Sequence, residues 1–231
     1  MYFMPLTNFL SISIIYLVPT TTVSGLNNLS ILGSKIMTQS NPQQVVSVNT
    51  APTFVNGVNL DILKGTVKAI QDDPGLGNCH FRATNQWVDG AHNRSTVTGF
   101  YGARQEIAHK QTFHMVADEP AILAGNDDGA NPVEHLLHAL ASCLTTSMVA
   151  HAAVRGIEIQ EIESELEGDI DLNGFLGLNS ETPKGFTRIR TNFRVKAAAE
   201  DIDAIKSLAS FSPVMNTLVS GVPVEVSVTP K

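Results

Sequence analysis

Cysteine is scarce in this chain of 231 residues, which contains only Cys79 and Cys143. Two cysteines exclude a disulfide framework as the main stabiliser, and the sequence has no CxxC pair and no Cys/His cluster with zinc spacing. Charged residues are also few, at 16%, and acidic side chains outnumber basic ones by 22 to 15. The resulting net charge of −7 argues against nucleic-acid binding, which needs a basic face. A glycine-rich phosphate loop and a GxSxG nucleophile elbow are both missing, so we expect no cofactor.

The first 34 residues carry no charged side chain, and Lys35 is the first. The apolar run FLSISIIYLV at 9–18 is too short for a comfortable membrane span, so we expect no stable one. A secretory signal would also have a positive start and a clear cleavage site. We therefore interpret residues 1–45 as a leader and disordered tail, with Met37 as the start of the functional protein. The expected location is the cytoplasm; the alternative is export or an organelle, if the leader is a targeting segment.

The rest of the chain has the mixed element order of an α+β protein. Residues 46–75 are expected to hold an N-terminal helix, capped by Asn59, and a linker. Residues 76–231 are expected to form the main domain. Alternating side chains and turn residues predict three strands, at 78–88, 92–102 and 110–118. A loop rich in turn residues is predicted at 119–131.

A long helix is predicted from Pro132 to Arg155, within the stretch NPVEHLLHALASCLTTSMVAHAAVRG. Asn131 is the expected N-cap and Glu134 completes a capping box, while Gly156 closes the helix. The helix is apolar on most of its sides, and such a helix needs burial on every face. One small sheet covers only one side, so we expect the same helix of a second copy to cover much of the other.

Two strands, at 157–172 and 186–197, alternate apolar and charged side chains. One carries an acidic row and the other a basic row, so their pairing is favoured and the basic row is interpreted as a solvated sheet face. A helix at 200–211 with Ile202, Ile205 and Leu208 inward, a short helix at 212–218 and a last strand at 222–228 complete the prediction.

Cys143 has two interpretations from its local sequence. A reactive thiol needs a helix N-terminus or a nearby cation to lower its pKa. Cys143 lies well past the first turn, where the helix dipole is weak, and its neighbours Thr146 and Ser147 carry no charge. It is therefore either a buried structural cysteine or a thiol activated from another segment or another chain.

Residues of about 76–229 resemble the OsmC/Ohr family, the osmotically induced protein C and organic hydroperoxide resistance proteins. The resemblance is carried by NPVEHLLHALASC and by SPVMNTL followed by VPVEV. It implies an OsmC-like α+β fold in which antiparallel sheets wrap long central helices of an intertwined homodimer. It also implies reduction of organic hydroperoxides by a peroxidatic thiolate that becomes a sulfenic acid and is resolved by a second cysteine. Cys143 matches the peroxidatic cysteine.

This sequence departs from the family pattern at three places. The second cysteine is missing, and Ala209 stands near its position. Val133 replaces the glutamate that follows the signature proline, and the preceding loop has no Arg or Lys. Arg82, Arg94 and Arg104 on the earlier strands are candidate substitutes, although each is more simply interpreted as a surface residue. Cys79 lies far in sequence from the family's second cysteine, so an external thiol is the expected resolving partner.

Two functions follow from these observations. The first is thiol-dependent reduction of organic hydroperoxides with Cys143 as nucleophile. The second is an OsmC-fold dimer without peroxidase chemistry that binds a small apolar molecule or serves structurally. His135 and His138 on the long helix make only an incomplete metal pair, so no metal site is predicted.

Overall fold

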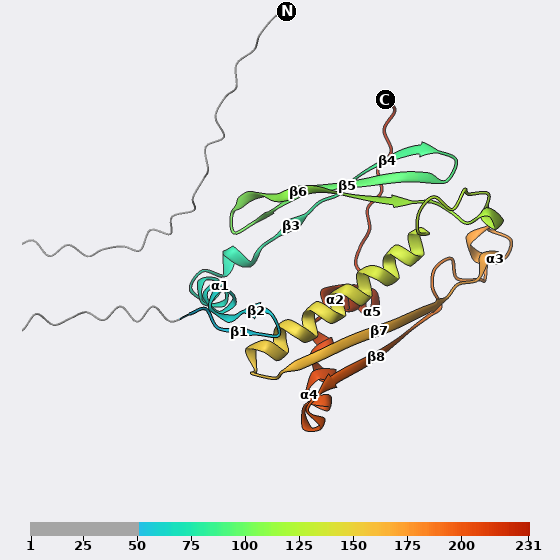
Figure 1. The fold of residues 1–231 in the computed structure, drawn as a ribbon. Coiled ribbons are helices and arrows are strands. Elements are labelled where there is room, and N and C mark those ends of the chain that lie inside the picture. The colour runs from blue at the N-terminus through green and yellow to red at the C-terminus, as the bar shows by residue number, and fades with distance from the viewer. Residues whose placement is uncertain (1–50) are drawn as a thin grey trace, which may run out of the picture. The chain divides into compact units, whose positions relative to one another are not determined.

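The computed structural model describes residues 51–231. The predicted leader and tail at 1–45 lie outside the described residues. Within the described part the protein is α+β, with antiparallel sheets and several helices, as the sequence predicts (Figure 1).

The described chain begins with a small hairpin and a helix. The hairpin pairs β1 (Phe54–Val55) with β2 (Val58–Asn59), and the helix α1 spans Leu60–Asp72. The side chain of Asn59 accepts hydrogen bonds from the first backbone N–H groups of α1, which confirms the predicted N-cap. At the hairpin turn, the Asn56 side chain bonds both the carbonyl oxygen of Ile157 and the N–H of Ile159, at 2.9 and 2.8 Å. One amide thus ties the N-terminal hairpin to the segment that follows the long helix.

Four strands form the first larger sheet, in which β5 pairs antiparallel with each of the other three. After the 3-10 helix η1 (Pro74–Gly77), these strands are β3 (His80–Phe81), β4 (Thr84–Asp89), β5 (His92–Gly102) and β6 (Gln105–Ala117). The predicted strand at 78–88 is thus divided in two. The predicted strand at 110–118 begins five residues earlier, because a tight turn at Ala103 and Arg104, both with positive φ, reverses the chain directly after β5.

The long helix α2 (Pro132–Val154) has the predicted start and N-cap and ends one residue before the predicted Arg155, which is its C-cap. Asn131 accepts from the N–H of Val133, and the Glu134 carboxylate accepts from the N–H of Asn131 at 2.8 Å. The 3-10 helix η2 (Ala121–Leu123) lies in the loop before it.

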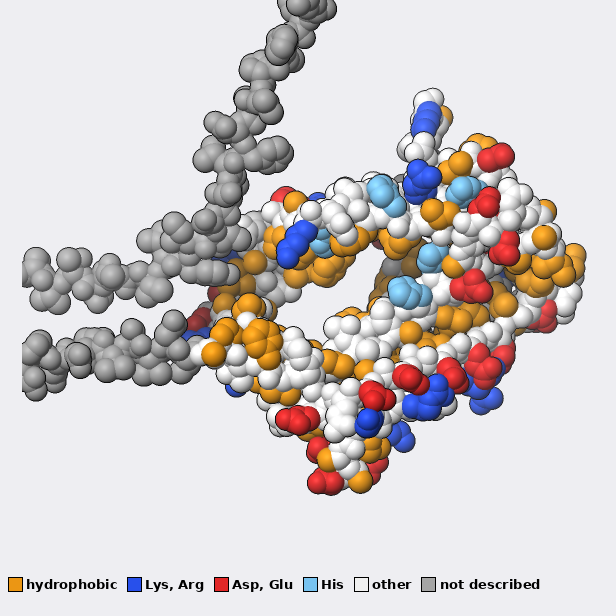
Figure 2. Space-filling view, viewed as in Figure 1, with side chains coloured by type: hydrophobic (Ala, Val, Ile, Leu, Met, Phe, Trp, Pro, Cys, Tyr) orange, Lys and Arg blue, Asp and Glu red, His pale blue; other side chains and the backbone are white. Residues whose placement is uncertain are grey.

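The second sheet pairs β7 (Ile159–Asp169) with β8 (Arg188–Ala197), joined through the short helix α3 (Leu172–Phe175). The predicted pairing of acidic with basic side chains is confirmed along the outer face, where Figure 2 shows red and blue side chains gathered. The ion pairs join Arg190 to Glu167 and Asp169, Arg194 to Glu163 and Glu165, and Lys196 to Glu161. All of them are at the surface, where each pair contributes little to stability but opposes other strand registers.

The C-terminal part is helical and ends in extended chain. It contains η3 (Ala199–Asp201), α4 (Ile202–Ser207), η4 (Leu208–Phe211) and α5 (Pro213–Ser220). Ile205 and Leu208 are buried as predicted, but Ile202 is 38% exposed. The predicted strand at 222–228 does not form within the described chain, and its four valines are exposed. A strand needs a hydrogen-bonding neighbour, and alternation of valines alone does not supply one.

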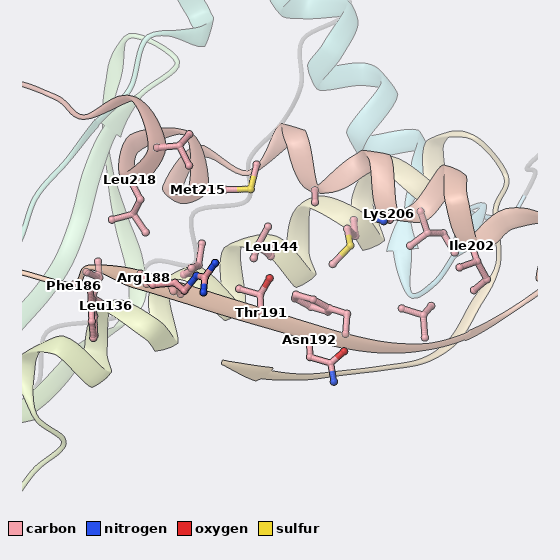
Figure 3. Close-up of a pocket in the computed structure, with 18 of the residues that line it drawn as sticks. Leu136, Leu144, Phe186, Arg188, Thr191, Asn192, Ile202, Lys206, Met215 and Leu218 are labelled. Carbon is pink, nitrogen blue, oxygen red and sulfur yellow. The ribbon is translucent and has the colours of Figure 1, made fainter. Parts of the chain in front are cut away.

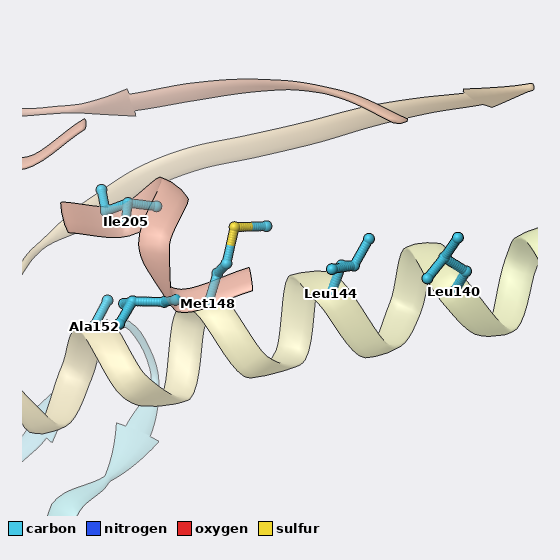
Figure 4. Close-up of a cluster of buried hydrophobic side chains, with 6 residues drawn as sticks. Leu140, Leu144, Met148, Ala152 and Ile205 are labelled. Carbon is cyan, nitrogen blue, oxygen red and sulfur yellow. The ribbon is translucent and has the colours of Figure 1, made fainter. Parts of the chain in front are cut away.

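The buried core lies between α2 and the C-terminal half of the chain (Figure 4). One stripe of α2 supplies Leu140, Leu144, Met148 and Ala152, spaced four residues apart. Ile205 and Leu208 cover this stripe, with β7, β8 and α5 around it. The core therefore fixes one face of α2 and leaves the remaining faces of the helix largely uncovered.

Candidate functional site

Cys143 lies in the middle of α2, one residue before the buried Leu144, and is half-buried. Because successive residues turn by about 100° around a helix, its side chain lies beside the core stripe and outside it. Ser147 is one turn further on, and Ser142 is exposed with its hydroxyl bonded to the Ala139 carbonyl oxygen. Neither cysteine forms a disulfide, and the Cys143 side chain is partly accessible.

The N-terminus of α2 is too far from Cys143 to ionise it. The thiol lies twelve residues past Asn131, or about 18 Å along the axis at 1.5 Å per residue. The dipole of a helix acts mainly within its first turn. Any activation of Cys143 therefore depends on a charged side chain from another segment, as the sequence suggests.

Few arginines of the described chain are available for that role. Arg82 is paired with Glu106 and Arg104 with Asp73, so these two are held by surface carboxylates. Arg155 contacts His151 and lies 5.5 Å above the centre of the Phe211 ring. Arg94 has no ion pair among the residues that the structure describes. Of the three arginines named as candidates from sequence, it is therefore the one that no carboxylate of the described chain holds.

The two histidines near the start of α2 do not come together as a metal site. His135 bonds the carbonyl oxygen of Val116 through Nε2 at 2.9 Å, and His138 is exposed. Across the described residues, no group of three or more His, Cys, Asp or Glu side chains lies close enough to hold an ion.

The loop that leads into α2 is organised by Asp118, which is 1% exposed. Its carboxylate accepts backbone N–H bonds from Glu119, Asn126 and Asp128 at 2.8 to 3.2 Å. These bonds, together with a smaller Coulombic contribution from His92, lower the pKa of Asp118 despite the opposing effect of its burial. Asp118 thereby holds the loop in the shape that delivers Asn131 to the helix cap.

We expect Asp118→Asn to destabilise the protein at pH 7 and to lose this effect in acid. Because the folded pKa lies below the unfolded value of about 3.9, the stabilising contribution is present above that value and disappears as the pH falls through the folded pKa. Chemical denaturation of both proteins from pH 7 to pH 3 measures this. An equal difference in unfolding free energy at every pH would contradict the assignment of the effect to the ionised carboxylate.

An open cavity of about 1060 Å³ adjoins the core on the side of α2 away from the β3–β6 sheet (Figure 3). Its walls come from α2, β8 and the helical segment from α4 to α5. Most of the lining is apolar, and the polar side chains Arg188, Asn192 and Lys206 also line it. Cys143 is not among the lining residues. No motif in the sequence predicts this cavity, and Arg188, which was predicted in the solvated basic row, is exposed and also lines the cavity.

Comparison with known families identifies part of the chain. Residues 125–227, which include all of α2 and Cys143, match the OsmC-like protein family. This segment of the chain resembles the OsmC-like family. The resemblance expected from sequence is therefore confirmed, over a segment that begins later than residue 76. No curated protein shows significant sequence similarity to this chain.

Solved structures that resemble the chain include the following three. An OsmC-like protein from Mycoplasma pneumoniae is 18% identical, with a TM-score of 0.46 over 61% of this chain and 88% of that one. An OsmC-like protein of unknown function from Vibrio cholerae is 12% identical, with a TM-score of 0.44 over 60% of this chain and 92% of that one. An organic hydroperoxide resistance protein OsmC from Legionella pneumophila is 13% identical, with a TM-score of 0.40 over 60% of this chain and 89% of that one. All three scores are below 0.5, so the resemblance to the family rests on the sequence match over residues 125–227.

Cys143 lies in the matched segment, whereas Val133 and Ala209 stand where the resemblance stated from sequence implies a glutamate and a second cysteine. Val133 is half-buried in the first turn of α2, and the half-buried Ala209 lines the cavity. Cys79 is exposed and lies beside Gly102, at the end of β5. Helix α2 is long and apolar enough to cross a membrane by composition, but a core helix of a soluble protein passes the same test.

Proposed function

We propose that this OsmC-like protein reduces organic hydroperoxides with Cys143 as the nucleophile. The observation that carries the proposal is the position of a free, half-buried Cys143 on α2, inside the segment that matches the family. A thiol that is partly shielded from water yet reachable from outside suits attack on a peroxide bearing an apolar group.

The reaction balances with an external thiol. The Cys143 thiolate attacks the O–O bond, the alcohol leaves after taking a proton, and Cys143 becomes a sulfenic acid. A small thiol then condenses with the sulfenic acid and releases water, and a second thiol opens the mixed disulfide to restore Cys143. An external thiol is invoked because Ala209 stands near the position of the family's second cysteine and Cys79 lies in another segment, directly before β3.

We further propose that the working form is a homodimer. The core covers one stripe of α2, and only 28% of its most apolar window is buried. On the β3–β6 sheet, Phe81, Trp87 and Phe113 are 76%, 69% and 44% exposed. Figure 2 shows an open gap between that sheet and α2, bordered by hydrophobic side chains. A second copy would bury both surfaces, and its charged side chains are the remaining source of a cation for Cys143.

The alternative function, binding without peroxidase chemistry, is favoured by one specific observation. Cys143 does not line the large apolar cavity, so a molecule bound in the cavity would not contact the thiol. Both functions can coexist in one protein, because they use different faces of α2.

The proposal predicts turnover that depends on an external thiol. Cumene hydroperoxide should be consumed by the protein with dithiothreitol present, and only about one equivalent per chain should be consumed without it. The remaining peroxide is measured by the absorbance that develops when it oxidises ferrous iron in a dye complex, and the blank contains dithiothreitol without protein. Consumption no faster than the blank would contradict hydroperoxide reduction.

A further inference from the structure

We propose that the cavity between α2, β8 and α5 binds an amphipathic anion, a molecule with a carboxylate group and one unbranched hydrocarbon tail. Arg188 binds the carboxylate and the apolar walls bind the tail. The site is separate from Cys143 and does not depend on the redox function proposed above.

The cavity has the size and shape for such a tail. Its volume of about 1060 Å³ slightly exceeds the usual range for small-molecule sites, about 300–1000 Å³. It follows α2 from Leu136 to Met148, about 18 Å at 1.5 Å per residue. It follows β8 from Arg188 to Val195, about 23 Å at 3.3 Å per residue. The space is therefore elongated, as Figure 3 also shows.

The walls are hydrocarbon along most of this length. Helix α2 contributes its core stripe, and the opposite wall includes Phe193, Ile205 and Met215. Burial of an aliphatic chain against such walls is favourable in proportion to the apolar area removed from water. A branched polar ligand would leave its hydrogen-bonding groups without partners here.

One end of the cavity carries the positive charge of Arg188, an exposed side chain that also contributes, after the hydrogen bonds from Arg190, to the lowered pKa of Asp169. Arg190 and Arg194 on β8 are held by carboxylates of β7, whereas Arg188 has no ion pair among the residues that the structure describes. Asp169, its neighbour in the strand register, instead receives two hydrogen bonds from Arg190. Figure 3 places Arg188 among the lining side chains toward the end marked by Leu136 and Phe186. A planar guanidinium in this position matches a carboxylate with two parallel hydrogen bonds.

Lys206 lines the opposite part of the cavity, near Ile202, and is also without an ion pair in the described chain (Figure 3). Its ammonium is strongly hydrated and flexible, so we assign it a minor part in recognition. The polarity of the site is thus set by Arg188, with the tail directed along β8 toward Ile202.

The C-terminal segment is the competing occupant. It leaves α5 beside Leu218 and Val219, which line the cavity, and carries Val222, Val224, Val226 and Val228 in exposed positions. Glu225 within it would be a carboxylate for Arg188. We favour a free ligand because this segment, although tethered at the cavity wall, does not lie among the lining residues.

Isothermal titration calorimetry with octanoate, decanoate and dodecanoate, below their micellar concentrations, tests the proposal. We expect saturable binding that strengthens by about fourfold for each added methylene. Decyltrimethylammonium, with the same tail and the opposite charge, should bind at least about tenfold more weakly than decanoate. The variant Arg188→Gln should weaken decanoate by about tenfold and leave 1-decanol unchanged.

The matched control is Arg194→Gln, which makes the same change on β8 at an arginine that does not line the cavity, and it should bind decanoate as wild type does. Cys143→Ser should also bind normally, so failure of the redox function would not affect this result. Equal binding of decanoate and decyltrimethylammonium, or no effect of Arg188→Gln, would overturn the proposal. Binding only after residues 222–231 are deleted would mean that the C-terminal segment occupies the cavity. Binding only to a monomeric species would mean that a second copy occupies it. Either result would also overturn the proposal.

Discussion

Cys143→Ser is expected to abolish hydroperoxide reduction, with a loss on the order of 10³-fold or more, the scale on which removal of a nucleophile acts. A serine hydroxyl stays protonated at neutral pH and is a poor nucleophile without a base. The side chain is half-buried and nearly the same size, so the fold should persist. Initial rates of cumene hydroperoxide consumption with dithiothreitol measure the effect, and circular dichroism checks the fold.

The matched control for this variant is Cys79→Ser. Cys79 is exposed at the edge of the first sheet, and we expect its replacement to change the rate by less than about twofold. A large loss in Cys79→Ser would mean that this thiol resolves the sulfenic acid, and the external-thiol cycle would then be wrong. Full activity in Cys143→Ser would remove Cys143 from the reaction altogether.

Leu208→Ala is expected to cost about 2–5 kcal/mol of unfolding free energy, the largest stability effect we predict. Leu208 is 3% exposed and covers the core stripe of α2, and it lies outside the open cavity, so the space left by truncation is enclosed. Urea denaturation at a fixed protein concentration measures the change, because a dimer would make stability depend on concentration.

Leu178→Ala provides the same chemical change at an exposed position. Leu178 is 71% exposed, and we expect its truncation to alter the free energy by less than about 0.5 kcal/mol. Similar costs at the two leucines would show that the packing of η4 on α2 is not the main source of stability in this half of the protein.

Local signals in the sequence were sufficient for several elements of the fold. The cap at Asn131, with Pro132 and Glu134, fixed the start of α2, because those residues satisfy the free N–H groups of a helix start by themselves. Opposed acidic and basic rows predicted the pairing of β7 with β8, because alternation and charge both act between directly opposite residues.

Other elements depend on partners that are remote in the sequence. The turn at Ala103 and Arg104 was missed because neither residue type favours positive φ, so no local signal announces the hairpin that starts β6 early. The segment at 222–228 alternates like a strand, yet it has no neighbouring strand within the described chain. Alternation predicts which face a strand would bury and says nothing of whether a partner is present.

The candidate site likewise has some features that local sequence predicts and others that depend on remote parts of the chain. Cys143 and its place in the middle of a helix could be predicted, because the helix is local and the thiol is one of only two. The cavity could not, since its walls come from residues about 80 positions apart that meet only in the folded chain. The cation that would activate Cys143 is likewise not encoded on α2 itself, where Thr146 and Ser147 are uncharged.

The most direct test is the rate at which Cys143 itself is oxidised. The reduced protein is mixed with one equivalent of cumene hydroperoxide, the sulfenic acid is trapped with dimedone at timed intervals, and each cysteine is quantified by peptide mass spectrometry. We predict that Cys143 is modified at least about 100-fold faster than free cysteine at the same pH, and that Cys79 reacts no faster than free cysteine. Oxidation of Cys143 at or below the rate of free cysteine would contradict its assignment as the working thiol.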